Sequence, residues 1–317
     1  MEENTIKASP TKEFFIEMLT RDIKLSRAII DLVDNSIDGA KNIRDDENYE
    51  GLNVKIQLSK EEFEIKDNCG GFPLEVAKSY AFRFGRPSET KFVKHSIGRF
   101  GVGMKRALFK MGKHFLVESK HKEDHFLVEV DIDDWINAKD EDGKPLWEFK
   151  YYSKKDIPKE KQKLNGEDGT IITVTKLYDS IKNDFNKSAF KNDLKKELSL
   201  ALSYSILKGL NVTLNGQSVT RKDISFLQSD DLKPLLGEPS TNTAGWYIFC
   251  NDRLVLEADR SYITGWRESR DDTENIIKFH NKYAMFRGAV FFDADDSKKL
   301  PMTTTKTGID TDHPIFK

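Results

Sequence analysis

The sequence predicts an α+β protein of two domains, and three observations support this expectation. The chain has 317 residues, enough for two domains that each bury a core. Its first half mixes helical periodicity with short runs in which apolar and polar residues alternate. A polar stretch at 182–187 then precedes a second series of helix and strand patterns. We therefore expect one domain at residues 1–180 and a smaller one at 181–317.

The composition predicts a soluble, cytoplasmic protein. Lys and Arg (51) nearly balance Asp and Glu (53), so the net charge of -2 gives no electrostatic argument for a dedicated nucleic-acid binder. Cys69 and Cys250 lie far apart and lack the spacing of zinc ligands, so we interpret both as reduced thiols. The first residues do not resemble a secretory leader, and no segment approaches the ~18 apolar residues of a membrane span.

The first predicted element is a helix from Thr11 to Ala40. Its apolar residues repeat at helical spacing and form a core face, while three polar side chains fall on another face. The apolar set is Leu25, Ala28, Ile29 and Leu32, and the polar set is Asp31, Asn35 and Asp38.

The remaining patterns predict a mixed sheet covered by helices on one face. In order, they indicate paired strands at 53–58 and 63–65, a helix from Leu74, an irregular basic loop from Arg83 to Arg99, a helix at 104–111, and strands at 114–119, 126–132 and 171–175. The second domain is expected to contain a helix at 191–208, strands at 211–214, 245–250 and 283–292, and a hairpin turn at Asn215-Gly216.

The predicted first helix carries the first candidate site. Asp31, Asn35 and Asp38 occupy positions i, i+4 and i+7, which places two carboxylates and an amide on one stripe. An Asn oxygen suits Mg²⁺, which keeps most of its waters and bridges to phosphates, and a nearby carboxylate can orient an attacking water. The alternative is an ordinary solvated helix face.

A second candidate site follows the strand at 63–65. Asp67 precedes Gly70, Gly71 and Phe72, and glycines at this point allow a positive φ and the close approach of a ligand. A buried Asp can accept a hydrogen bond from an adenine amino group. The alternative is an ordinary turn.

A third candidate site is the glycine-rich segment 98–105. Gly98, Gly101 and Gly103 precede the helix at 104–111, whose N-terminal N–H groups and dipole favour a phosphate. This GxxGxG pattern is weak evidence by itself. It is not the Rossmann fingerprint, because no strand immediately precedes it, and no Walker motif is present.

The order of these clusters, followed by Gly169-Thr170 on a strand, resembles the GHKL ATPase superfamily over about residues 14 to 178. That superfamily includes gyrase, the ninety-kilodalton heat-shock chaperones, MutL, sensor histidine kinases and the microrchidia ATPases. The resemblance implies a Bergerat-fold ATP-binding sandwich that uses ATP and Mg²⁺.

The resemblance also implies roles for individual residues. Asp31 takes the position of the catalytic base, Asn35 that of the Mg²⁺ ligand, and Asp67, assisted by Thr170, contacts adenine. The Arg83 to Arg99 segment becomes the ATP lid. The other implied nucleotide contacts are Asp38, Gly71, Phe72, Gly98, Arg99, Phe100, Gly101, Val102, Gly103, Met104 and Lys105.

Two positions depart from the family pattern. The base is usually Glu, and Asp31 is one methylene shorter, so an attacking water must lie closer or turnover is slow. The first glycine of the family's DxGxG is Cys69 in this chain, which affects the expected shape of that turn.

The second domain resembles the transducer domain of gyrase, MutL and microrchidia proteins. The segments that carry this resemblance are Gly209–Gly216, the strand around Gly245-Trp-Tyr-Ile-Phe and Leu300–Gly308. In those relatives a transducer lysine reaches the γ-phosphate, and Lys306 is the candidate by position. The alternative is an exposed loop lysine. Histidine kinases fit poorly. They need a phosphoacceptor histidine on a helix upstream of the ATPase domain, and the first histidine of this chain is His95.

The leading functional hypothesis is therefore an ATP-operated clamp, in which ATP and Mg²⁺ order the lid and favour a homodimer until hydrolysis reopens it. The second hypothesis is a nucleotide-gated binding module with little turnover, suggested by Asp31 in place of Glu. A third, action on DNA or with a protein effector, rests on analogy with the relatives.

Overall fold

The computed structural model describes residues 8–84, 97, 102–222, 240–266 and 277–316. Most of the predicted lid, and the site residues Gly98, Arg99, Phe100 and Gly101, lie outside the described residues.

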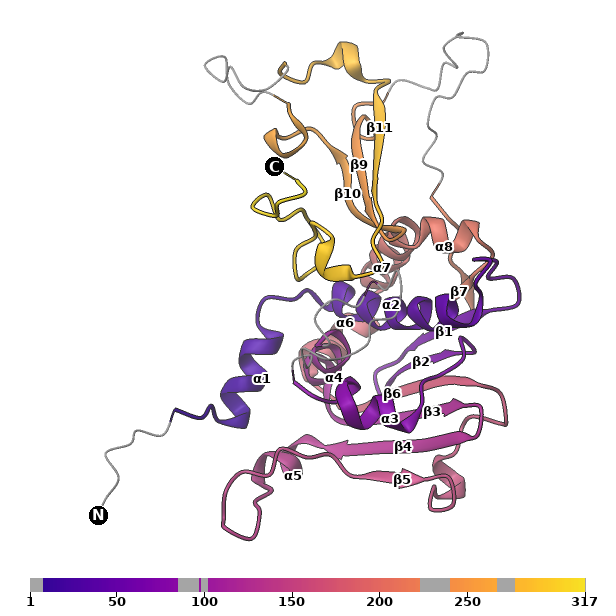
Figure 1. The fold of residues 1–317 in the computed structure, drawn as a ribbon, viewed down its shortest axis with the longest axis vertical. Helices are drawn as coiled ribbons and strands as arrows, with labels where there is room; N and C mark the ends of the chain where they lie inside the picture. Colours follow the sequence, from indigo (N-terminus) through magenta and orange to yellow (C-terminus); the bar gives the residue numbers. More distant parts are fainter. Residues whose placement is uncertain (1–7, 85–96, 98–101, 223–239, 267–276, 317) are drawn as a thin grey trace.

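The described residues form two sheets (Figure 1). The large sheet has the strand order β5-β4-β3-β6-β2-β1-β7-β8 and is antiparallel except between β1 and β7. The small sheet has the order β10-β9-β11. The strands are β1 (Asn53–Leu58), β2 (Phe63–Asp67), β3 (Gly112–His121), β4 (Asp124–Asp131), β5 (Tyr151–Ser153), β6 (Gly169–Leu177), β7 (Asn211–Leu214), β8 (Gln217–Ser218), β9 (Gly245–Cys250), β10 (Arg253–Asp259) and β11 (Arg287–Phe292). The protein is therefore α+β, as the sequence predicts.

The helices are mostly short, and α2 lies between the two sheets (Figure 1). They are α1 (Lys12–Thr20), α2 (Leu25–Ile43), α3 (Leu74–Val76), α4 (Gly103–Met111), α5 (Ile132–Asn137), α6 (Asp179–Asn186), α7 (Ser188–Ala201) and α8 (Ser203–Leu207), and a π-helical turn at Ala77–Ala81 continues α3. Among the helices in the described ranges, none has the length and apolar character that crossing a membrane requires.

The predicted helix from Thr11 to Ala40 is two helices in the structure. The break falls at residues 21–24, where no Gly or Pro announces it. Tertiary contacts fix it instead: Lys12 in α1 donates to the backbone carbonyls of Trp135 and Ala138 near α5, and Ile23 in the break is buried. Contacts distant in sequence thus override a continuous helical pattern.

The strand predictions at 53–58, 63–65, 114–119, 126–132 and 171–175 are confirmed with small extensions. The hairpin turn at Asn215-Gly216 is also confirmed, and both residues have positive φ (48° and 76°), as a two-residue turn of this type requires. Strand β10 was missed, although Arg253–Asp259 follows a tight turn after a confirmed strand.

The polar stretch at 182–187, on which the predicted domain boundary rests, lies mostly in helix α6. Its Ile181 and Phe185 are buried in the main core. Beyond it, β7 pairs in parallel with β1, and Leu194, Leu198 and Val212 join the same core. The large sheet thus continues to Ser218, past the predicted domain boundary at residue 180, and the small sheet begins at Gly245.

Helix α2 has three faces, and each lies in a different environment. Its apolar residues, such as Ile29 and Val33, are fully buried in the core. Its cavity face carries Asp31, Asn35, Asp38 and Asn42. A third stripe, Asp34 and Lys41, contacts the small-sheet part of the chain. The spacing of seven residues keeps those two on one side of the helix.

Gly39 in α2 allows the helix to approach the loop after β2. A Cβ atom at this position would lie 2.6 Å from the carbonyl oxygen of Cys69. Gly39→Ala in a helix interior ordinarily raises stability by up to about 1 kcal/mol. We expect the opposite sign, a loss of about 2 kcal/mol in the free energy of unfolding, because backbone must move. Chemical denaturation measures this difference.

Gly308→Ala is the matched control, since its nearest neighbour to an added Cβ is a Thr303 methyl group at 3.7 Å, an ordinary contact. It should change the free energy of unfolding by less than about 1 kcal/mol. Equal effects of the two substitutions would contradict the proposed close approach.

Candidate functional site

One cavity collects most of the site residues that the sequence predicts. Its walls come from α2, the end of β2 and the following loop, the π-helical turn, the start of α4, β6 and the loop at 304–306. The predicted residues that line it are Asp31, Asn35, Asp38, Asp67, Gly71, Phe72, Val102, Gly103, Met104, Thr170 and Lys306. Residues that are up to 275 positions apart in the chain therefore share one hollow.

Asp67 forms the buried end of this cavity. Its Oδ2 accepts a hydrogen bond from the Ser36 hydroxyl at 2.7 Å. Its Oδ1 accepts from the backbone N–H groups of Cys69 at 2.9 Å and Thr170 at 3.3 Å. Burial raises the pKa of Asp67, and these three donors oppose that rise. A carboxylate has about four lone pairs, so one on Oδ2 is left to accept from an amino group of a ligand.

Gly71 lets the chain pass close to β3 beside this end. It has a φ of +57°, and a Cβ atom there would lie 2.2 Å from the carbonyl oxygen of Lys120. Ser119 fixes the next residue, because its hydroxyl bonds both the N–H and the C=O of Phe72, at 2.9 and 3.0 Å. The backbone of Gly71 and Phe72 is therefore held against the sheet.

Cys69 stands where the family pattern has its first glycine, and its backbone does not adopt a conformation that requires glycine. Residues 70 and 71, both glycines, have positive φ, whereas Cys69 does not. The Cys69 thiol is buried, and burial raises its pKa, so it stays protonated and inert at neutral pH.

The middle of the cavity presents an amide and a carboxylate from α2. Asn35 is exposed, although its neighbours Asp34 and Ser36 are buried. Asp38 accepts a hydrogen bond from the Ile97 N–H at 2.7 Å. Burial raises the Asp38 pKa to about 6, against the opposing effects of that bond and of the Lys41 and Lys306 charges.

No protein cage for a metal exists in the described part of the chain, where no three His, Cys, Asp or Glu side chains cluster suitably. This arrangement fits Mg²⁺, which commonly takes one or two protein oxygens and completes its shell with water and substrate phosphates. The exposed amide of Asn35 is a suitable ligand.

The other end of the cavity holds Asp31 in two ion pairs. Arg106 of α4 lies 2.6 Å from its Oδ2, and Lys306 lies 3.1 Å from its Oδ1. Burial by itself would raise the pKa of Asp31, but the charges and hydrogen bonds of Lys306 and Arg106 outweigh burial and lower it. Asp31 is ionised at neutral pH and engaged on both oxygens.

Lys306 belongs to the predicted transducer-like part and nevertheless reaches this end of the cavity. Its Nζ lies 2.8 Å from Asp34 Oδ2 and 3.1 Å from Asp31 Oδ1. Burial would lower the pKa of Lys306, yet the two carboxylates raise it, so the amine stays charged. It is therefore a buried and paired lysine, unlike an exposed loop lysine.

Sequence reasoning missed three charged residues of this cluster. Arg106 could have been found, because it follows Met104-Lys105 at the start of α4. Asp34 directly precedes Asn35 and was passed over because it lies off the predicted polar stripe. Arg253 of β10 carries no local signal, and only the fold brings it within 3.4 Å of Asp34.

Lys105 is not brought to the cavity. Its side chain is buried, and its Nζ donates a 2.6 Å hydrogen bond to the Ala81 carbonyl. Burial lowers its pKa to about 7. Its predicted contact with phosphate stays a prediction, as do those of the four lid residues outside the described part.

Comparison with known proteins identifies the part of the chain that contains most of these residues. None of the curated proteins that were compared matches the chain. Residues 23–163 match the family described as "Histidine kinase-, DNA gyrase B-, and HSP90-like ATPase". That span includes α2, the Asp67 turn and the start of α4, while Thr170 and Lys306 lie beyond it. Residues 23–163 therefore form an ATPase domain of the GHKL type, which implies binding and hydrolysis of ATP.

Proposed function

We propose that the protein binds ATP with Mg²⁺ in this cavity, hydrolyses it slowly, and uses the nucleotide to close a lid and form a homodimer. One observation carries the proposal: an exposed amide, a buried aspartate with a spare lone pair, a helix start and a buried lysine converge on one cavity. Together they suit a nucleoside triphosphate with its metal ion. The amide suits the metal, the aspartate the adenine, the helix start the phosphates and the lysine the terminal phosphate.

The adenine end follows from hydrogen bonding. Asp67 Oδ2 would accept from the adenine amino group, with Thr170 beside it on β6. At the opposite end, Gly103 begins α4, and its free N–H groups and helix dipole favour a phosphate. The resemblance to relatives adds the lid segment, including Gly98 and Gly101.

The chemistry assigned to Asp31 requires a rearrangement of its ion pairs. A bound Mg²⁺ would supply positive charge against the phosphates, with Asn35 as its protein ligand. Lys306 and Arg106 both point toward this end, and a terminal phosphate would compete with Asp31 for these cations. Asp31, once released from them, can orient and deprotonate a water. Its short side chain and its double pairing both favour slow turnover.

The clamp mechanism draws support from the way the small sheet contacts α2. This helix forms ion pairs or hydrogen bonds with Lys306, Arg253 and the Asn251-Asp252 turn. A change at the phosphate end thus has a direct path to the second part of the chain. Action on DNA or with a protein effector rests on analogy with the relatives alone.

A second candidate function is a nucleotide-gated binding module with little turnover. The observation that favours it is the engagement of both Asp31 oxygens. A steady-state phosphate-release assay separates the two functions, because such a module binds ATP without releasing phosphate above background.

We predict that Asp31→Asn abolishes ATP hydrolysis, with a fall of about 100-fold or more, while ATP binding persists. The amide cannot accept a proton from water, yet it keeps the size of the side chain. Phosphate release measures turnover, and calorimetry measures binding. Unchanged turnover would remove Asp31 from the role of base. Loss of binding of both ATP and ADP would instead indicate a damaged cavity.

We further predict that a non-hydrolysable ATP analogue with Mg²⁺ shifts the protein from monomer to dimer, whereas ADP does not. Light scattering after size exclusion measures the mass. Asn35→Ala, which removes the proposed metal ligand, should abolish the shift. If the protein is still a monomer at a saturating concentration of the analogue, the clamp hypothesis is wrong.

Asp38 gives a prediction on pH dependence. Its pKa in the fold, about 6, lies above the ordinary value of 3.8. The stability that this group contributes is therefore fully present below about pH 4 and is lost as pH rises through about 6. Asp38→Asn removes that loss, so the variant should gain about 2 kcal/mol relative to the wild type between pH 4 and pH 7, without nucleotide. A pH-independent difference in the free energy of unfolding would contradict it.

A further inference from the structure

Asp34 has no part in the nucleotide contacts described above, yet it is the most deeply buried carboxylate around the cavity. It is 0 % exposed, and it lies on the stripe of α2 that faces the small-sheet part of the chain. A charge in such a place is costly unless cations match it. Among the described residues, its two ion-pair partners both come from the small-sheet part, Lys306 and Arg253. Arg27 of α2 also interacts electrostatically with Asp34, without an ion pair to it.

The two oxygens of Asp34 are used unequally. Oδ2 accepts a 2.8 Å hydrogen bond from the Lys306 amine. Oδ1 lies 3.4 Å from Arg253 Nε, close enough for an ion pair but without a hydrogen bond. Arg253 is 2 % exposed, and its Nε and Nη1 find no hydrogen-bond acceptor in the described residues. One buried acceptor, Asp34 Oδ1, and one buried donor, Arg253 Nε, therefore face each other without a hydrogen bond.

Lys306 pairs with two carboxylates, of which one lines the cavity and the other does not. Its bond to Asp34 is shorter than its contact with Asp31, 2.8 against 3.1 Å. Only Asp31 lines the nucleotide cavity, together with Lys306 itself. The Lys306 amine thus has one carboxylate partner that lines the cavity, Asp31, and one that does not, Asp34.

The loop around Lys306 is held by bonds within itself, and its ends, Met302 and Ile309, are buried in one core with residues of β9 and β10. Thr303 N–H bonds the Gly308 carbonyl, Lys306 N–H bonds the Thr303 carbonyl, and Met302 bridges to Ile309. Lys306 adopts φ +54°, a left-handed conformation that costs a residue with a side chain about 1 kcal/mol. Because the loop is fixed, the amine changes partner by a movement of the side chain.

We propose that Asp34 is a positioning residue that competes with the terminal phosphate for Lys306, and that Arg253 makes the exchange feasible. When Lys306 moves to the phosphate, Arg253 donates to the vacated Asp34, so no buried charge is left unpaired. This inference rests on the proposed ATP site, and it assigns to that site the discrimination between ATP and ADP. It concerns Asp34 and Arg253, which touch neither substrate nor metal.

The exchange predicts opposite effects for the two residues. Asp34→Asn removes the competitor, so Lys306 is more available to the terminal phosphate and ATP binds more tightly relative to ADP. Arg253→Gln leaves Lys306 as the one remaining ion-pair partner of Asp34 in the described residues, so release of the lysine leaves a buried carboxylate without an ion pair and ATP loses its advantage. ADP lacks the terminal phosphate, and its affinity should change little in either variant.

The experiment measures the dissociation constants of a non-hydrolysable ATP analogue and of ADP, both with Mg²⁺, by calorimetry on the full chain. The quantity of interest is the ratio of the ADP to the ATP-analogue constant. We expect Asp34→Asn to raise this ratio roughly tenfold and Arg253→Gln to lower it by a similar factor, as for other charged groups in contact. In a Lys306→Ala background, Asp34→Asn should no longer change the ratio.

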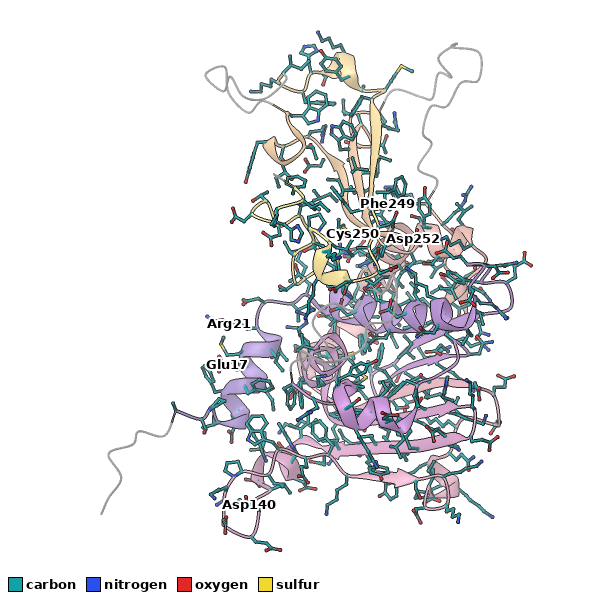
Figure 2. The ribbon with its side chains drawn as sticks, in the orientation of Figure 1. Glu17, Arg21, Asp140, Phe249, Cys250 and Asp252 are labelled. Atoms are coloured by element: carbon teal, nitrogen blue, oxygen red, sulfur yellow. The ribbon has the colours of Figure 1, made fainter. Side chains whose placement is uncertain are left out.

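Asp252→Asn is the matched control. Asp252, labelled in Figure 2 near Cys250, also joins the small-sheet part to the helices, through Lys208 at 2.5 Å and Lys41 at 3.8 Å. Lys306 is not among its ion-pair partners in the described residues. This variant should leave the ratio unchanged. Arg253→Gln covers the case in which Asp34→Asn does not fold, because it tests the same exchange from the side of the other partner of Asp34.

The outcomes separate this inference from the proposed function. If the wild type binds neither nucleotide, the proposed function is wrong. If it binds both but Asp34→Asn and Arg253→Gln leave the ratio unchanged, the competition for Lys306 is wrong while the ATP site stands. A shift of the same size in Asp252→Asn would also overturn it, because general loosening of the contact would then explain the effect.

Discussion

Two carboxylates buried on one helix set the constraint on which the rest of the structure depends. Asp31 and Asp34 lie three residues apart in α2 and are 3 % and 0 % exposed. Unpaired buried carboxylates would destabilise the fold by several kcal/mol each. The compensating cations come from α4, through Arg106, and from the small-sheet part, through Lys306 and Arg253. Neutralising α2 therefore requires three separate segments to meet.

That requirement also places the cavity. Arg106 draws the start of α4 to α2, which brings Gly103 and its exposed N–H groups beside Asp31. At the other end of α2, Gly39 admits the loop after β2, which carries Asp67. Asp31 and Gly39 of one helix thus hold the two ends of the proposed nucleotide site. The rise of α2 between these two residues fixes the span.

The sequence predicts those parts of the fold and site in which neighbours in the chain decide the outcome. Alternating strands such as 53–58 and the turn at Asn215-Gly216 depend on local pattern and local backbone preference. The helical spacing of Asp31, Asn35 and Asp38 likewise follows from local geometry, and all three line the cavity.

The features that local pattern could not predict depend on partners far along the chain. The break between α1 and α2 follows from Lys12 bonding to carbonyls more than 120 residues away. The pairing of β7 with β1 places residues beyond 180 in the large sheet, whereas composition suggested a linker nearby. Nothing in the sequence indicates that Arg253 and Asp34 form an ion pair, because only the fold brings them together.

The departure at Asp31 and the unpredicted Asp34 cluster have one physical explanation. An aspartate carboxylate stays closer to the helix backbone than a glutamate carboxylate would, by about one methylene. That position suits pairing with Lys306, which Asp34 already holds near the surface of α2. A longer side chain would extend past the lysine toward the cavity. The shortened side chain, a weakness if the residue acts only as a base, therefore lets Asp31 and Asp34 share one cation from the small-sheet part. The slow hydrolysis proposed above and the close coupling between the two parts of the chain are, on this reasoning, two consequences of the same methylene.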